Sequence, residues 1–108
     1  MRRLGDWLDD RHPAPPGELR EAIHSLIAAE EGGEEPIHDR LATVALGELR
    51  RIAAEPSRRS AAPRLLAVDA LLTYACEAAA EAGPDALEAL TGRLDWARFE
   101  DLLQEVRG

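Results

Sequence analysis

Several residue types are scarce in this sequence, and these shortages limit the fold classes and functions that the protein can have. Its 108 residues include one cysteine, Cys76, and no lysine, and aromatic residues make up only 4% of the chain. A single cysteine excludes a disulfide within the chain. Since no run of alternating β-branched or aromatic residues is present, nothing predicts a β-strand. We therefore expect an all-α protein.

Positive charge is also scarce, because 13 arginines face 21 acidic residues and the net charge is −8. Binding to nucleic acids or to anionic membranes relies on positive surface charge, so the composition argues against both. No window approaches the ~18 uncharged apolar residues of a membrane-spanning helix. No apolar run of signal-peptide length follows Arg2 and Arg3. We expect a cytoplasmic protein, and no motif predicts a cofactor.

The most apolar part of the chain is residues 60–83, which are rich in alanine and leucine. Its pattern is that of a long helix that is apolar almost all round, and such a helix must be covered by others. We therefore predict a compact bundle of four to five helices around a central helix at about residues 60–83. The length predicts one domain over residues 1–108. We expect Tyr74 and Cys76 to be packing residues, since nothing in this helix activates the thiol.

Proline and glycine divide the rest of the chain into shorter helices. Breaks fall at residues 12–17, 32–33, 55–57 and 83–84. Pro36 suits the first position of a helix. The predicted neighbours of the central helix therefore cover residues 2–11, 18–31, 36 to about 54, 85–90, and a last segment that begins at Asp95.

The core predicted from this pattern is thin, because alanine buries little area. Self-association adds buried area, and tryptophan is favoured as an anchor in interfaces. We therefore predict a small non-catalytic interaction or accessory protein that forms a homo-oligomer or docks onto a protein partner through apolar helix faces. The expected partner-binding residues are Trp7, Trp96, Phe99 and Leu103. Alternatively, the two tryptophans close the two ends of a monomeric core.

A cluster of arginines at residues 50–64 supports a second function, a binding module for phosphate, diphosphate or a carboxylate. The expected anion-binding residues are Arg51, Arg58, Arg59 and Arg64. They flank the N-terminus of the predicted central helix, where free N–H groups and the helix dipole favour an anion. Alternatively, these arginines pair with the surplus of acidic residues in the chain itself.

Two Glu-x-x-His spacings support a third function, a dimeric ferritin-like metal site. Glu35 and His38 of each chain would supply the ligands. The other pair, Glu21 and His24, falls on the solvent side of its helix by periodicity. The alternative for the first pair is a capping glutamate beside a partly buried histidine.

Asp69 is an unusual residue in so apolar a helix. A buried carboxylate is costly unless it is paired. We expect Asp69 either to pair with Arg40, Arg51 or Arg64, or to face a polar pocket with Thr73.

Overall fold

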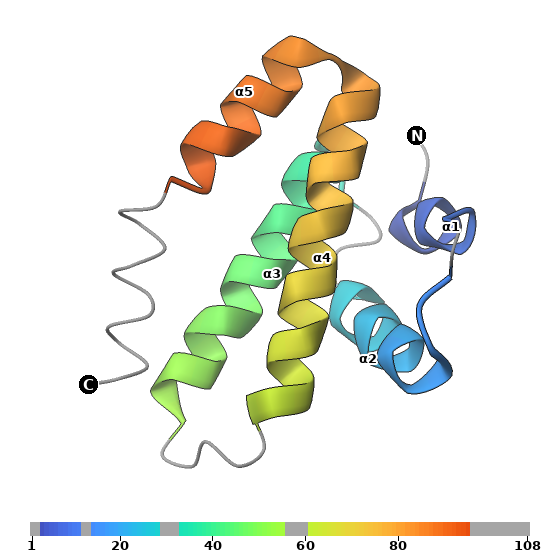
Figure 1. Cartoon of the computed structure of the whole chain (residues 1–108), viewed down its shortest axis with the longest axis vertical. Coiled ribbons are helices and arrows are strands. Elements are labelled where there is room, and N and C mark those ends of the chain that lie inside the picture. Colours follow the sequence, from blue (N-terminus) through green and yellow to red (C-terminus); the bar gives the residue numbers. More distant parts are fainter. Residues whose placement is uncertain (1–2, 12–13, 29–32, 56–60, 96–108) are drawn as a thin grey trace.

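The computed structural model describes residues 3–11, 14–28, 33–55 and 61–95, and in these ranges every regular element is a helix (Figure 1). The elements are α1 (Leu4–Asp9), α2 (Gly17–Ile27), α3 (Ile37–Ala54), α4 (Ala61–Ala82) and α5 (Pro84–Arg93). The prediction of an all-α bundle is confirmed. Helix α2 is described as far as Ile27, and residues 29–31 of the predicted helix lie outside the described residues. Helix α5 continues through Gly92. The last predicted helix, from Asp95 onward, lies outside the described residues except for its first position.

Proline and glycine set the helix boundaries through their backbone geometry. Pro36 caps α3 in an extended conformation, one position before the place predicted for it. Gly83 has a φ of 123°, a backbone conformation that residues other than glycine rarely adopt. Pro84 then begins α5, where its missing N–H costs no hydrogen bond. This Gly-Pro pair lets α5 turn back along α4.

Helix α4 is the central element of the bundle. It packs against α2, α3 and α5, and Trp7 connects α1 to it. Helices α3 and α4 form an antiparallel pair, with α1 and α2 on one side and α5 on the other (Figure 1). Among the described residues, no helix combines the length and the hydropathy needed to cross a membrane.

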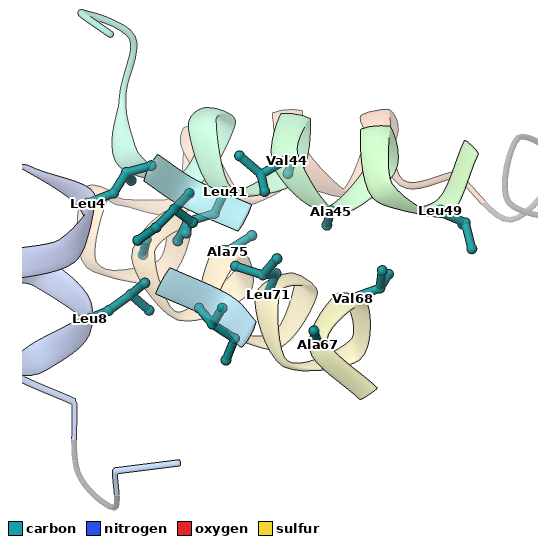
Figure 2. Close-up of a cluster of buried hydrophobic side chains, with 14 of the residues drawn as sticks. Leu4, Leu8, Leu41, Val44, Ala45, Leu49, Ala67, Val68, Leu71 and Ala75 are labelled. Atoms are coloured by element: carbon teal, nitrogen blue, oxygen red, sulfur yellow. The ribbon is translucent and has the colours of Figure 1, made fainter. Parts of the chain in front are cut away.

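The core lies mainly between α3 and α4. Figure 2 shows Leu41 and Ala45 of α3 close to Leu71 and Ala75 of α4, and all four are fully buried. The remaining buried leucine, isoleucine and valine side chains come from every helix, so the five helices share one core: Leu4, Leu8, Ile23, Ile27, Val44, Leu49, Ile52, Val68 and Leu90. Alanine fills much of the α4 side, which lets the two central helices approach closely.

The expectation that neighbours cover α4 on almost every side is wrong in one respect. Its residues 62, 66, 69, 73, 76 and 80 are all exposed, and helical spacing places them along one side. Leu66 is 61% exposed and Leu65 is 40% exposed. Helix α4 is therefore central, but the other described helices leave one long face of it exposed.

Candidate functional site

The first predicted site residue, Trp7, is part of the core. Its side chain is 3% exposed, and its Nε1 donates a hydrogen bond to Oε1 of Glu81 on α4 at 3.1 Å. The Arg11 guanidinium lies 4.0 Å from the centre of the Trp7 ring and donates to the other Glu81 oxygen at 2.6 Å. Tyr74 meets the ring edge-on at 6.2 Å. Burial, and then the Glu77 carboxylate, raise the pKa of Tyr74, while Arg11 opposes the shift.

These contacts favour the alternative that Trp7 closes one end of the core. In this conformation the indole has no free face for a partner, because Arg11 covers it and Glu81 holds its only donor. The other three predicted partner-binding residues, Trp96, Phe99 and Leu103, lie outside the described part of the chain. Their role stays a prediction.

The predicted anion site contains acidic partners from the chain itself. Arg64 donates to both oxygens of the buried Glu48, at 3.0 and 3.3 Å, and also to Glu55. Arg51 donates to Glu48 at 3.1 Å. The hydrogen bonds from Arg64, and then those from Arg51, hold the pKa of Glu48 below its ordinary value. The hydrogen bonds to Glu48, and then to Glu55, raise the pKa of Arg64.

Arg64 therefore joins α4 to α3, while Arg51 pairs with Glu48 within α3, as the pairing alternative expects. Glu48 is the functional residue that sequence reasoning missed. Its spacing of three from Arg51 was a visible signal, but its contact with Arg64 depends on how the two helices pack. Arg58 and Arg59 lie outside the described residues, so an anion site that uses them stays a prediction.

The structure does not bring together the predicted metal ligands within one chain. Glu35 is exposed ahead of α3, whereas His38 is buried, with its Nε2 3.7 Å from Oδ1 of Asp39. In the described ranges, no three His, Cys, Asp or Glu residues form a group suited to a metal ion. A site shared between two chains would need a second copy to supply the remaining ligands.

Only the histidine of the second Glu-x-x-His pair helps to connect α1 and α2. His24 Nε2 lies 3.2 Å from Oδ1 of Asp9, and Arg20 donates to the same oxygen at 2.8 Å. The Arg20 hydrogen bond is the main reason why the pKa of Asp9 is lowered. Glu21 is exposed and takes no part in this cluster.

The expectation that Asp69 is paired or lines a polar pocket is wrong. Its side chain is exposed on the uncovered face of α4, so water solvates the carboxylate and no partner is needed. Arg64 is occupied by Glu48 and Glu55, and Arg40 is buried in α3, where it makes an interaction of its own. The Thr73 hydroxyl donates to the backbone oxygen of Asp69 at 3.0 Å, not to its carboxylate.

Two shallow grooves flank the central helices, but their carboxylates are already bonded within the chain. One groove of about 330 Å³ lies beside Trp7, His38 and Glu81, and Glu81 holds Trp7 and Arg11. A second groove of about 250 Å³ lies between α2 and α4, above Glu48 and Arg64, which hold each other. Neither groove therefore offers an unused carboxylate to a ligand.

The most distinctive surface is the uncovered face of α4, which we call the outer face. It consists of Ala62, Leu66, Asp69, Thr73, Cys76 and Ala80, all exposed. Leu65 and the half-buried Leu72 border it. The expectation that Cys76 is a packing residue is wrong, since its thiol is free and exposed on this face. The outer face thus combines apolar side chains, one carboxylate, one hydroxyl and one thiol.

Comparison with known protein families, with curated proteins and with solved structures finds no match to this chain.

Proposed function

We propose that this protein is a small, non-catalytic helical interaction protein that self-associates through the outer face of α4. The observation that carries the proposal is the 61% exposure of Leu66 in the second turn of the bundle's most apolar helix. Covering that much of a leucine contributes on the order of 1 kcal/mol per side chain. A symmetric dimer covers two copies of it.

The anion-binding and metal-binding functions have weaker support, because their described residues are exposed or already have contacts within the chain. Two of the four predicted anion-binding arginines are matched by acids of the same chain. Of the two predicted metal ligands, Glu35 is exposed and His38 faces Asp39. In the described part of the chain, no residue of the outer face takes part in an ion pair. We also propose a cytoplasmic location, because an exposed single thiol is compatible with a reducing compartment.

The two most informative substitutions are Leu66→Glu on the outer face and Leu87→Glu on α5. Leu87 is 39% exposed and lies off the outer face, so both changes add one negative charge at an exposed leucine. We expect Leu66→Glu to weaken the dimer at least about tenfold, a loss of ~1.4 kcal/mol, because a charge is placed in the interface. We expect Leu87→Glu to leave dimerisation nearly unchanged. Sedimentation velocity over a range of protein concentrations measures both.

Circular dichroism serves as the control that both variants keep the helical fold. Equal weakening by the two substitutions would mean that added charge, and not the outer face, controls association. A wild-type chain that stays monomeric at every concentration would refute self-association itself.

A further inference from the structure

We infer that α1 is a strap that opens from the bundle by itself, while the helices α2 to α5 stay folded. In the closed state its Trp7 occupies a seat on α4 that consists of Tyr74 and Glu81. Glu81 is the residue that holds the strap closed. The inference is independent of self-association, because it concerns contacts within one chain.

Helix α1 depends on the bundle for its helical structure. It has six residues, and its N-cap residue, Arg3, supplies no side-chain hydrogen bond to the free N–H groups. An isolated helix shorter than about 12 residues is marginal in water. Separation from the bundle therefore also unfolds α1, so that opening is an order-to-disorder change of one segment.

The connection to α2 lets α1 separate without disturbing its neighbour along the chain. Pro15 and Pro16 precede α2 and have no N–H group, so helical hydrogen bonding does not continue from α1 into α2. Pro16 has an extended backbone, with a ψ of 152°. The N–H of Arg20 donates to the Pro16 oxygen at 2.8 Å, so α2 begins with bonds that do not involve α1.

Two carboxylates attach α1 to the bundle, and both lie at the surface. Glu81 of α4 accepts from Trp7 at 3.1 Å and from Arg11 at 2.6 Å, and its side chain is 54% exposed. Asp9 of α1 accepts from the exposed Arg20 of α2 at 2.8 Å. Exposed ion pairs contribute little, because water replaces them at small cost. The Asp9 pair alone therefore does not hold the strap closed.

Glu81 contributes more, because it satisfies a buried donor. Trp7 is buried, and the indole N–H is its one polar group. A buried donor without an acceptor is costly, so the seat favours the indole as long as Glu81 accepts its hydrogen bond. Arg11 covers the ring and joins the same carboxylate. Loss of Glu81 thus weakens two attachments of α1 together.

Opening of the strap exposes an apolar hollow in the bundle. Leu4, Trp7 and Leu8 are buried in the closed state, and Figure 2 shows Leu4 and Leu8 pointing from α1 into the core. Trp7 also forms part of the wall of the groove of about 330 Å³ beside His38. Its departure joins this groove to the vacated seat. The open state therefore presents apolar surface beside the Glu81 carboxylate, and the closed state hides it.

Hydrogen exchange of single amides, followed by NMR on dilute protein, tests the inference. The strap is reported by the amides of Trp7, Asp10 and Arg11, which donate to backbone oxygens of residues 3–8. The core is reported by the amides of Ala45 and Ala75, which are fully buried. In the wild type we expect the strap amides to exchange at least about 100-fold faster than the core amides. We also expect urea to accelerate them less, because opening exposes less surface than complete unfolding.

Three substitutions separate opening of the strap from unfolding of the bundle. Leu71→Ala leaves a cavity between α3 and α4 in the closed and open states alike, so we expect core amides to exchange about 100-fold faster and strap amides at their wild-type rate. We expect Glu81→Ala to accelerate the strap amides about tenfold. The matched control is Glu88→Ala, at an exposed glutamate of α5, and we expect it to change their rate less than about twofold.

Wild-type strap amides that exchange as slowly as the core amides would show that α1 opens only with the whole bundle, and would overturn the inference. Equal acceleration of strap and core amides by Leu71→Ala would overturn it in the same way. Strap amides that respond no more to Glu81→Ala than to Glu88→Ala would show that Glu81 does not hold the strap. Each of these results leaves the proposed self-association untouched.

Discussion

At the scale of single residues, the described polar side chains mainly join helices to one another. Trp7 and Arg11 reach Glu81 to fix α1 on α4, and Arg20 reaches Asp9 to fix α2 on α1. Glu48 is the most buried of these acids and receives hydrogen bonds from two arginines. Such a carboxylate contributes more to stability than exposed ion pairs do.

The contribution of Glu48 to the stability of the fold is larger at neutral pH than in acid. Its pKa in the folded chain is below the ordinary value of 4.5. The ionised carboxylate therefore stabilises the fold fully above pH 4.5, and this contribution is lost as the pH falls below that value. We expect Glu48→Gln to lower the free energy of unfolding by about 2 kcal/mol at pH 7. Below pH 4.5 we expect the free energy of unfolding of the variant to depend less steeply on pH than that of the wild type.

Urea unfolding followed by circular dichroism between pH 3 and 7 measures both effects. The control is Glu88→Gln, because Glu88 is an exposed glutamate on α5. We expect this change to stay within about 0.5 kcal/mol of the wild type. If Glu48→Gln kept the full acid dependence of the wild type, the cluster around Glu48 would not be a source of stability.

At the scale of helices, the positions of the elements could be predicted from the sequence because proline and glycine mark their ends. The side of α4 that faces the core could not be predicted, because alanine occurs on its covered and uncovered sides alike. One signal was present: Asp69, Thr73 and Glu77 are spaced four apart and so share one side of the helix. The cluster of Glu48 with Arg64 was beyond prediction, because it depends on how α3 and α4 align.

The two sides of α4 differ in what a leucine contributes. Leu71 is fully buried, whereas Leu66 is 61% exposed. We expect Leu71→Ala to lower the free energy of unfolding by about 3 kcal/mol, because it leaves a cavity between α3 and α4. We expect Leu66→Ala to change it by less than about 0.5 kcal/mol in the monomer. Urea unfolding at low protein concentration compares the two, and equal losses would contradict the assignment of the outer face.

At the scale of the whole molecule, two features act against each other. An alanine-rich core and an uncovered leucine favour the burial of more surface, whereas a net charge of −8 keeps copies of the chain apart. Added salt screens that repulsion and strengthens apolar contacts only slightly. The balance therefore predicts a dimer that becomes tighter as salt increases, unlike an assembly held by ion pairs.

The most direct test of this account is the mass of the unmodified chain in solution, measured by sedimentation equilibrium under reducing conditions. The account predicts an average mass that rises from 11.8 kDa toward about twice that value as the concentration approaches ~1 mM. It also predicts a steeper rise in about 0.5 M than in about 0.05 M sodium chloride. A mass that stays at 11.8 kDa at both salt concentrations would contradict it.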